Sequence, residues 1–543
     1  MEMNDFLPMS LTVTRGGEKE VITVSESVTT FFAPAGSGRM IMKFSVPIVD
    51  IVGYWHTNER WPINKLHWNI SVSSSALRFW PLLTLFNSAG INRFTFTVSE
   101  RILDCDMKVA MNQADAAYIV TLEFPVSRDK DLEFDLYIDT QPTVWPEAVR
   151  RSADFCDKNV YEFPEAAWEP VFCSWYLGHA AIDHKIIEES ARRCAELGFK
   201  TYIVDDGWCF DTYKRVDGTP QPWYCDIGDW EVSRKKFPDF EEHIERIHAM
   251  GMKYMLWTTP FLVGVNSKFF AEHKDGFGDI DIAASRIPDF HNREVCERAI
   301  SNLVRLVETY NIDGLKVDFI DKPEPSLENP TGEAGYEFVR ELSERLRKVK
   351  PDCMIEFRES YAHKSMLPFG TQFRCGDVPL DWMDNLRRLA KIIMELGDGV
   401  PRHADPAYWN DNELPENISR HMISAIAGVP MLSVDLSRQS GQTLEIIADK
   451  ISFYNDHIEI YKKGHWEVSY FGFNLTWVKG SCDDEAILIV LDEKRIPELR
   501  EKTTYLFNLS SEYLTFDNAE YFDCAGKKVS DAVPPGGKAV ISR

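Results

Sequence analysis

Short apolar runs of strand length alternate with amphipathic stretches of helix length through the middle of this chain, and no other feature constrains its fold as much. The predicted strands cover 171–175, 201–205, 253–257, 315–318, 354–357, 372–374 and 431–434, with a weaker one between 398 and 410. The predicted helices lie near 182–197, 239–250, 293–310, 334–349, 382–397 and 442–460. Repeated strand–helix units over roughly 290 residues are typical of a (β/α)8 barrel, the TIM-barrel fold.

The apolar residues on either side of this region follow a different periodicity. Residues 91–98 and 132–139 alternate apolar and polar side chains with period two, which predicts strands with one buried face. Similar strands return at 486–491 and 503–509. Because 543 residues exceed what one hydrophobic core supports, we predict a multidomain protein of mixed α/β and β class. Its parts are an N-terminal β-sandwich at 1–165, a central barrel at 166–462 and a small C-terminal β-sandwich at 463–543.

Charge and cysteine content exclude several kinds of partner. The formal net charge of −25 would repel phosphates, so nucleic acid and anionic membranes are not expected. The eleven cysteines contain no C-x-x-C pair, which favours reduced thiols over a disulfide framework. The N-terminus lacks a basic segment followed by an apolar one, and no apolar run is long enough to cross a membrane. We therefore predict a cytoplasmic protein with a small neutral substrate and no cofactor, and leave a homo-oligomer open.

The run from Ile312 to Phe319 is a short apolar strand that ends in charged side chains. Lys316 and Asp318 lie two residues apart, so both point to one face of the strand. A second strand-like stretch ends at Asp377, with Asp381 close behind it. Two aspartates at two barrel strand ends are what a retaining glycosidase needs, since one attacks the anomeric carbon and the other protonates the leaving oxygen. Each aspartate could instead cap the helix that follows it.

Polar and aromatic side chains also follow the other predicted strands. They are Trp175, Asp205, Asp206, Trp257, Glu356 and Arg374. Charged groups bind sugar hydroxyls and an aromatic ring covers the apolar sugar face, so this set predicts a monosaccharide pocket. Glu356 and Arg358 could instead pair with each other. Cysteines near the strand ends lack metal-ligand spacing, and we predict no metal site.

The order of motifs through the barrel resembles glycoside hydrolase family 36, in the α-galactosidase clan (clan D). The matching segments are Val171-Phe172-Cys173-Ser174-Trp175, Asp205-Asp206-Gly207-Trp208, Gly228-Asp229-Trp230 and Gly314-Leu315-Lys316-Val317-Asp318, within roughly residues 165 to 440. The resemblance implies a retaining exo-α-glycosidase, with α-galactosidase as the first choice. It makes Asp318 the nucleophile and Asp377 the acid/base. Substrate contacts would come from Trp175, Asp205, Asp206, Trp257, Lys316, Glu356, Arg374 and Asp381.

Because the sequence departs from the family pattern at three places, it does not determine which sugar the site binds. Thr258-Thr259-Pro260 lacks an acidic residue, Phe319-Ile320-Asp321 replaces Asn-Arg, and Glu356 to Tyr361 replace a glycine-rich segment. The alternatives are a transglycosylase, a glycosidase for α-N-acetylgalactosaminides or β-L-arabinopyranosides, and a non-catalytic carbohydrate-binding relative. We expect the two catalytic carboxyl groups to lie roughly 5–6 Å apart. We also expect Lys316 to keep Asp318 ionised and the charge of Asp318 to raise the pKa of Asp377.

Overall fold

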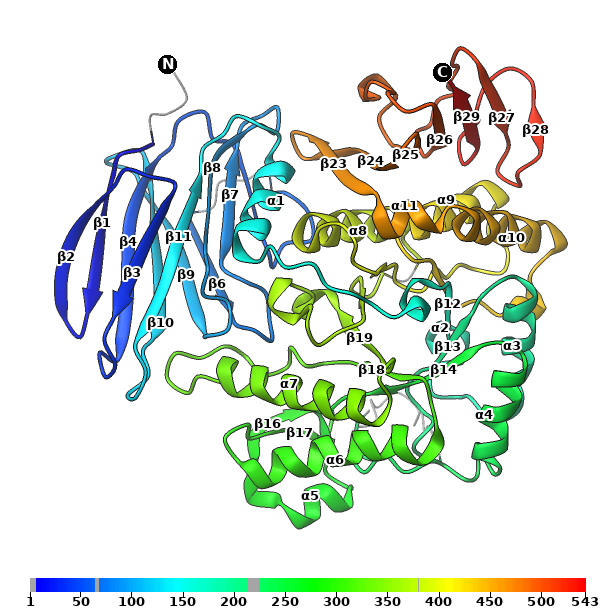
Figure 1. Cartoon of the computed structure of the whole chain (residues 1–543), viewed down its shortest axis with the longest axis horizontal. Helices are drawn as coiled ribbons and strands as arrows, with labels where there is room; N and C mark the ends of the chain where they lie inside the picture. Colours follow the sequence, from blue (N-terminus) through cyan, green and yellow to red (C-terminus); the bar gives the residue numbers. More distant parts are fainter. Residues whose placement is uncertain (1–5, 64–67, 212–223, 379) are drawn as a thin grey trace.

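The computed structural model describes residues 6–63, 68–211, 224–378 and 380–543. A helix-covered barrel occupies the centre, with β-rich regions before and after it in the chain (Figure 1). The predicted multidomain class is confirmed, with a parallel barrel between β-rich regions. The boundaries drawn at 165/166 and 462/463 stay predictions.

The N-terminal region consists of two antiparallel sheets packed face to face, which confirms the predicted sandwich. One sheet has the order β2-β1-β4-β10-β9-β6 and the other β3-β11-β8-β7-β5. Their strands are β1 Met9–Arg15, β2 Glu18–Val24, β3 Val28–Ala33, β4 Arg39–Pro47, β5 Gly53–His56, β6 Asn69–Ser74, β7 Leu82–Phe86, β8 Asn92–Val98, β9 Cys105–Asn112, β10 Ala117–Pro125 and β11 Leu132–Asp139. Alternate residues of β4 point into the core between the sheets, as period-two sequences require.

The expectation that this region is entirely β is wrong at one place. Helix α1 (Trp145–Cys156) follows the last strand of the sandwich and begins with a proline in its first turn, where the missing N–H costs nothing. It buries Trp145 and Val149 in the cluster that also contains the barrel core. Local alternation predicted the strands, but this helix is stabilised by packing against β8 and the barrel helix α8 (Trp382–Leu396).

The central sheet is parallel and curves into a nearly closed barrel, as predicted. Its order is β21-β20-β19-β18-β14-β13-β12-β22. The strands are β12 Val171–Cys173, β13 Thr201–Val204, β14 Lys253–Thr258, β18 Gly314–Val317, β19 Met354–Arg358, β20 Gln372–Arg374, β21 Arg402–His403 and β22 Met431–Leu432. The weak strand expected between 398 and 410 is β21. Single parallel bridges from His403 to Val429 and from Ala407 to Leu432 link the two open edges.

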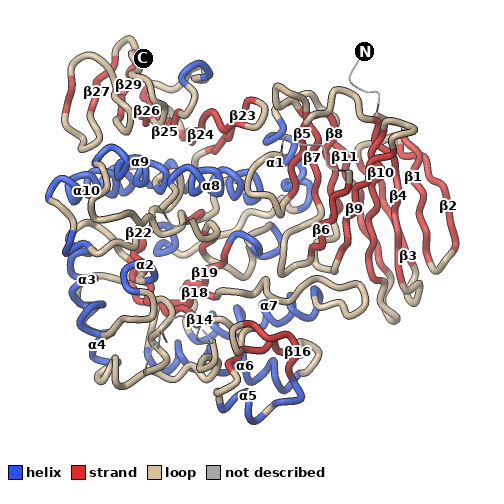
Figure 2. The backbone as a smooth tube through the Cα atoms, turned by 180° about the vertical axis from the view of Figure 1, so that it is seen from behind, coloured by secondary structure: helices blue, strands red, loops and turns tan. Residues whose placement is uncertain are grey.

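The barrel helices surround this sheet (Figure 2). Their bounds are α3 His184–Glu196, α4 Phe240–Ala249, α6 Arg293–Tyr310, α7 Gly332–Val349, α8 Trp382–Leu396, α9 Pro415–Ala425, α10 Gly441–Asp456 and α11 Ile458–Lys463. The helix expected at 442–460 is divided into α10 and α11, and α9 was not predicted. A short helix α2 (Trp175–Gly178) follows β12. The small sheet of β15 (Val263–Gly264), β17 (Ser285–Pro288) and β16 (Phe277–Ile282), with helix α5 (Lys268–Glu272), is an unpredicted insertion after β14.

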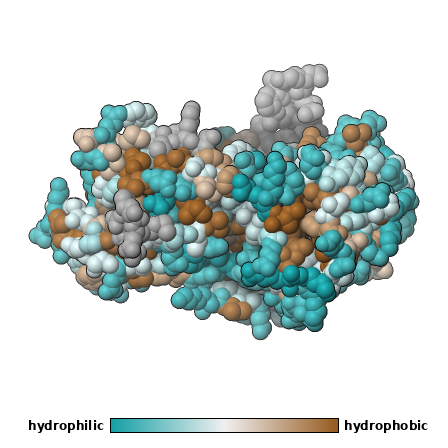
Figure 3. Space-filling model, turned by 90° about the horizontal axis from the view of Figure 1, so that it is seen from above, coloured by the Kyte–Doolittle hydropathy of each residue, from teal (hydrophilic) through white to brown (hydrophobic). Residues whose placement is uncertain are grey.

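The C-terminal region forms one sheet in the order β23-β24-β25-β26-β29-β27-β28, with its own apolar cluster. Its strands are β23 His465–Phe471, β24 Asn474–Cys482, β25 Glu485–Val490, β26 Thr503–Asn508, β27 Ala519–Phe522, β28 Lys528–Val529 and β29 Lys538–Ser542. Figure 3 shows hydrophobic patches interspersed among hydrophilic residues on one face of the whole molecule. Among the described helices, none is both long and apolar enough to cross a membrane.

Candidate active site

Strand β18 places two charged side chains at the carboxyl end of the barrel. It lies between β14 and β19, and the neighbour β19 comes very close at Gly314. A Cβ atom on Gly314 would stand 2.3 Å from the carbonyl oxygen of Met354, so only glycine fits there. Leu315 and Val317 point outward into the core beneath the helices, while Lys316 points into the barrel and Asp318 follows directly after the strand.

A cavity of about 120 Å³ opens at this end of the barrel. Its lining contains most of the predicted site residues together with two aromatic residues that were not predicted to be there. The lining residues are Trp175, Asp205, Asp206, Tyr224, Trp257, Lys316, Asp318, Phe319 and Asp377. They come from strands β14 and β18 and from the segments that follow β12, β13, β18 and β20, which are far apart in sequence and converge only when the barrel closes. The volume is well below that of pockets for drug-sized ligands, about 300–1,000 Å³, and so suits one sugar ring.

Asp318 is buried at the cavity and receives several hydrogen bonds. Nε1 of Trp257 donates to Oδ2 at 3.1 Å, and the amide of Phe319 donates to Oδ1 at 2.9 Å. Nη1 of Arg358 lies 3.3 Å from Oδ1. Burial alone would raise the pKa of Asp318, but the charges of Arg358, Lys316 and Arg374 outweigh burial and hold the pKa well below its ordinary value. The carboxylate is therefore ionised and faces the cavity.

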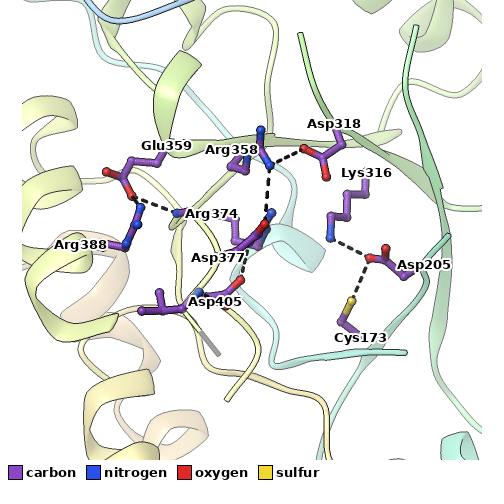
Figure 4. A network of polar contacts seen from close by, with 12 residues as sticks. Cys173, Asp205, Lys316, Asp318, Arg358, Glu359, Arg374, Asp377, Arg388 and Asp405 are labelled. Atoms are coloured by element: carbon purple, nitrogen blue, oxygen red, sulfur yellow. Dashed lines mark hydrogen bonds and ion pairs between the residues drawn. The ribbon is translucent and has the colours of Figure 1, made fainter. Parts of the chain in front are cut away.

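Lys316 is engaged mainly with Asp205. Its Nζ lies 2.7 Å from Oδ2 of Asp205, and both side chains are buried. The Sγ of Cys173 donates to the same oxygen at 3.2 Å (Figure 4). Burial lowers the pKa of Lys316, but the charge of Asp205 outweighs it and the net pKa is raised. Lys316 does help to ionise Asp318, as expected, but Arg358 has the larger influence on the pKa of that carboxyl.

Asp377 lies at the mouth of the cavity, and its side chain is 56% exposed. Nη1 of Arg374 donates to Oδ1 at 3.1 Å, and Nη1 of Arg358 lies 3.7 Å from Oδ2. Burial and the charge of Asp318 raise the pKa of Asp377, but Arg374 and Arg358 prevail and the net pKa is lowered. The charge of Asp318 does raise the pKa of Asp377 as expected, but the expectation of a net raised pKa is wrong, because the two arginines outweigh it.

One atom limits the separation of the two carboxyl groups. Nη1 of Arg358 lies 3.3 Å from Oδ1 of Asp318 and 3.7 Å from Oδ2 of Asp377. These two oxygens can therefore be no farther apart than the sum of the distances, about 7 Å. Retaining glycosidases place their carboxyl groups about 5–5.5 Å apart and inverting ones about 6.5–9.5 Å apart. The upper limit of about 7 Å excludes most of the carboxyl separations found in inverting glycosidases.

Comparison with known proteins finds similar chains and similar folds. The family model Melibiase matches residues 165–338. The bifunctional α-galactosidase/sucrose kinase AgaSK of Mediterraneibacter gnavus is 25% identical over 217 residues, 38% of this chain and 22% of its own. The α-galactosidase Mel36A of Lactobacillus acidophilus is 26% identical over 198 residues, 34% of this chain and 26% of its own. The crystal structure of the GH36 α-galactosidase AgaA from Geobacillus stearothermophilus superposes with a TM-score of 0.66 at 14% identity, covering 98% of this chain and 81% of that chain.

The middle of the chain is thus similar in sequence to the Melibiase family model and to α-galactosidases, and the whole chain shares the fold of GH36 α-galactosidases. The sequence matches to these two curated relatives span about a quarter of their length, whereas the fold similarity extends over nearly all of this chain.

Two predicted site residues are buried and are not among the described residues that line the cavity. Arg374 and Glu356 are each 1% exposed, and Nε of Arg374 lies 3.3 Å from Oε1 of Glu356. Nε2 of Gln372 donates to the other oxygen of Glu356 at 3.1 Å. The alternative that Glu356 pairs with Arg358 is wrong, because Arg358 contacts Asp321 and the two cavity aspartates instead. Arg374 and Glu356 therefore support the described cavity wall from below.

Asp405 completes this buried layer and was missed by sequence reasoning. It forms an ion pair with Arg374 and accepts hydrogen bonds from the amide of Val378 at 2.7 Å and from Oη of Tyr176 at 3.3 Å. Burial raises the pKa of Asp405 to about 7 despite the arginine. Asp405 lies two residues after β21, which was the weakest of the predicted strands. Its position after a barrel strand was the only sequence feature that could have indicated a place near the site.

Asp381 caps helix α8. Its Oδ1 accepts a hydrogen bond from the amide of Asp384 at 2.9 Å, and the residue is exposed. The described residues that line the cavity do not include it. Of the two interpretations raised from sequence, the geometry favours the helix cap over the substrate contact. Trp223 lies outside the described residues, and Trp230 packs against Trp208 and Trp257.

Within the described ranges, no group of three or more His, Cys, Asp or Glu side chains is arranged to hold a metal ion. The cavity presents an ionised carboxylate, a second carboxyl at the mouth, and other charged groups that can bind hydroxyls.

Proposed function

We propose that this protein is a retaining exo-α-glycosidase that removes a terminal α-galactosyl residue. The observation that carries the proposal is that Asp318 and Asp377 face one small cavity and share one guanidinium nitrogen, which keeps their oxygens within about 7 Å. The α-galactosidase names of the relatives support the choice of sugar.

In the first step, Asp318 attacks the anomeric carbon from the β face while the bond from that carbon to the leaving oxygen breaks. Asp377 gives its proton to that oxygen, and the sugar becomes an ester of Asp318. In the second step, Asp377 takes a proton from water, the water oxygen attacks the same carbon, and Asp318 leaves as a carboxylate. Both displacements invert the carbon, so the product keeps the α configuration.

The proton for the first step depends on substrate binding. In the structure, Arg374 and Arg358 hold the pKa of Asp377 below its ordinary value. A sugar in the cavity removes water from this half-exposed carboxyl, and the loss of solvation raises its pKa while Asp318 is still charged. Once Asp318 has become an ester its charge is gone, the pKa of Asp377 falls again, and the carboxylate is ready to act as a base.

The rest of the lining supports binding of a single terminal sugar. Asp205, Asp206 and Lys316 present acceptors and donors for hydroxyl groups at the base of the cavity. Trp175 and Trp257 present flat apolar surfaces for the C–H face of the ring. A cavity of about 120 Å³ takes one ring and leaves the remainder of the substrate outside, which is exo action.

A substrate panel tests the proposal. We expect p-nitrophenyl α-galactopyranoside to be cleaved, and NMR of the reaction to show the α-anomer as the first product. Faster cleavage of the α-N-acetylgalactosaminide or the β-L-arabinopyranoside would change the sugar that we assign to the site but would leave the proposed mechanism unchanged. Transfer of galactose to a sugar acceptor in preference to water would make the protein a transglycosylase. Binding of galactose without turnover of any of the three glycosides would reject the enzyme.

We also propose a reducing, cytoplasmic location. All eleven cysteines lie among the described residues, and none is in a disulfide. Thiols persist in this form where glutathione and thioredoxin keep them reduced. Labelling of free thiols in protein isolated under native conditions would test this, with fewer than eleven reactive thiols after denaturation as the contradicting result.

A further inference from the structure

Arg358 stands at the centre of the polar network of the site. It is the last residue of β19, and its side chain is only 12% exposed. Its Nη1 corner points to Asp318 and Asp377, as Figure 4 shows, at 3.3 and 3.7 Å. Its Nη2 atom lies 3.2 and 3.4 Å from the two oxygens of Asp321. An arginine keeps its positive charge at every physiological pH, so this charge is permanent.

Phe319 and the Asp321 carboxyl together fix the orientation of the guanidinium group of Arg358. Its carbon lies 4.8 Å from the ring centroid of Phe319, so the flat group stacks on this aromatic ring. Phe319 has a φ angle of 58°, a left-handed conformation that residues with a side chain rarely adopt. Asp321 is itself held by the hydroxyl of Ser360. The surroundings thus leave one corner of Arg358 free to reach the two carboxylates of the cavity.

The other cations near the site have different partners. Lys316 forms its short ion pair with Asp205, and Arg374 is divided among Asp377, Asp405 and Glu356. Among the residues that the structure describes, Arg358 is the cation that contacts both Asp318 and Asp377. Arg358 lies in the segment from Glu356 to Tyr361, which departs from the pattern of glycoside hydrolase family 36.

We propose that Arg358 is a positioning residue for the reaction: one corner of its guanidinium group holds the nucleophile and the acid/base side by side and releases Asp377 when the sugar enters. The inference rests on the proposed function. The longer contact is the one to Asp377, which is also the more exposed carboxyl, so this is the partner that a substrate can displace. The contact to Asp318 stays, because a nucleophile has to remain ionised until it attacks.

The charged and titratable groups around Arg358 define what its removal would do. Asp318 and Asp321 follow β18, Asp377 follows β20, Lys316 and Arg374 extend from those strands, and Tyr224 and Tyr361 add two phenols. Arg358 lowers the pKa of both Asp318 and Asp377. Without it, both carboxyls would hold protons at higher pH. The acidic limb of the kcat/KM profile, which reports ionisation of the nucleophile in the free enzyme, would then move to higher pH.

The kinetic test compares Arg358→Gln, Arg358→Lys and Arg151→Gln. The last is a matched control, because Arg151 also pairs with a buried aspartate, Asp139 at 2.6 Å, but in the N-terminal region. We expect Arg358→Gln to lower kcat/KM about 100-fold and to shift the acidic limb upward by about one pH unit or more. Arg358→Lys keeps the charge but not the planar fork, so the limb stays near that of the parent while kcat falls about tenfold. The control should behave like the parent.

A parent-like rate and pH profile in Arg358→Gln would overturn the proposal. If this variant does not fold, a parent-like kcat in Arg358→Lys would overturn it equally. A second measurement does not need activity. The low pKa of Asp318 stabilises the folded parent above the ordinary aspartate pKa of about 3.9, and the stabilisation is lost as the pH falls toward the folded value. In Arg358→Gln the folded pKa of Asp318 is higher, so the difference in urea midpoint between the two proteins should be constant at neutral pH and should narrow once the pH falls below that higher folded pKa.

The two measurements separate the two proposals. Narrowing of the urea difference in a protein that cleaves no glycoside would reject the proposed function and keep Arg358 as the residue that controls the charge of Asp318. Normal turnover with a constant urea difference and an unmoved acidic limb would reject the role of Arg358 and keep the proposed function.

Discussion

The two ends of strand β18 carry aspartates with nearly the same burial but different surroundings. Asp313 directly precedes the strand and Asp318 directly follows it, and each is 5% exposed. At both residues burial raises the pKa and positive or hydrogen-bonding partners outweigh it, so both pKa values lie well below the ordinary one. Burial and charge alone do not distinguish them.

What differs is how their oxygens are used. Asp313 receives a hydrogen bond from Nε2 of His248 at 2.7 Å, one from the amide of Tyr254 at 2.8 Å and one from Nζ of Lys350 at 3.0 Å. Asp318 lines a cavity in addition to its protein contacts. In barrel enzymes the carboxyl end of the strands carries the chemistry and the amino end carries stability. A low carboxyl pKa therefore indicates a functional site only where a cavity accompanies it.

The largest expected effect is at the cavity end. Asp318→Gly should lower kcat by about 10⁴-fold or more, because removal of a nucleophile removes the covalent route. Azide should restore cleavage of an activated substrate and give the β-glycosyl azide, since the anion enters from the face that Asp318 occupied. Product analysis by NMR checks this, and an α-azide would remove Asp318 from the role of nucleophile.

Asp377→Ala should affect substrates unequally. We expect a loss of about 10²–10⁴-fold for substrates with poor leaving groups and a much smaller loss for those with good ones, which need little proton donation. The measurement is a series of aryl glycosides of graded leaving-group pKa, under conditions in which glycosylation limits the rate. Equal losses across the series would assign Asp377 a structural role.

A substitution at the amino end of β18 should change the stability of the protein and leave its catalytic rate unchanged. Asp313→Ala removes one partner of a buried charge cluster, so we expect it to lower the free energy of unfolding by about 3–5 kcal/mol. At a temperature where the variant is folded, its kcat should equal that of the parent. Urea denaturation and steady-state kinetics on one preparation check both. A large loss of kcat in folded Asp313→Ala would break the distinction between the two ends.

The pH dependence of stability should be alike at the two ends. Because the folded pKa values of Asp313 and Asp318 are depressed, the unfolded chain takes up protons first as the pH falls. Their stabilisation is complete above about pH 5 and declines below it, toward the folded pKa values. We expect the urea midpoint of the parent to fall between pH 5 and pH 3, and to fall less in Asp313→Ala and in Asp318→Gly. If the urea midpoint of a variant depended on pH as steeply as that of the parent, the aspartate removed in that variant would not have a depressed pKa in the folded parent.

The smallest expected effect is at Asp381, which lies near the mouth but caps α8. Asp381→Ala should lower the free energy of unfolding by about 1 kcal/mol, the usual loss for an N-cap, and leave KM and kcat unchanged. Asp381→Ser, which can still cap the helix, is the matched control and should recover the stability. An increase in KM in both variants would restore Asp381 to the substrate site.

Local sequence was sufficient for the barrel and for much of the cavity. The period of the apolar residues records which face of each element is buried, and it placed α6 at residues 293–310 and Lys316 and Asp318 on one face of β18. The rule that barrel chemistry lies at the carboxyl ends of strands then identified Trp175, Asp205, Asp206, Trp257 and Asp377 as candidates, and they line the cavity. These inferences need only the neighbours of a residue along its own strand.

Tertiary structure determined how the charged groups are paired. The sequence could not tell that Arg358 would contact Asp318 and Asp377 and not Glu356. It also could not tell that Asp405 would pair with Arg374 or that Asp381 would cap α8. Helix α1 likewise depends on its packing against the barrel. The physical reason is that a side chain of either charge is satisfied by whichever opposite group lies within a few ångströms, and which groups meet is set by closure of the barrel, which brings together strand ends that are far apart in the chain.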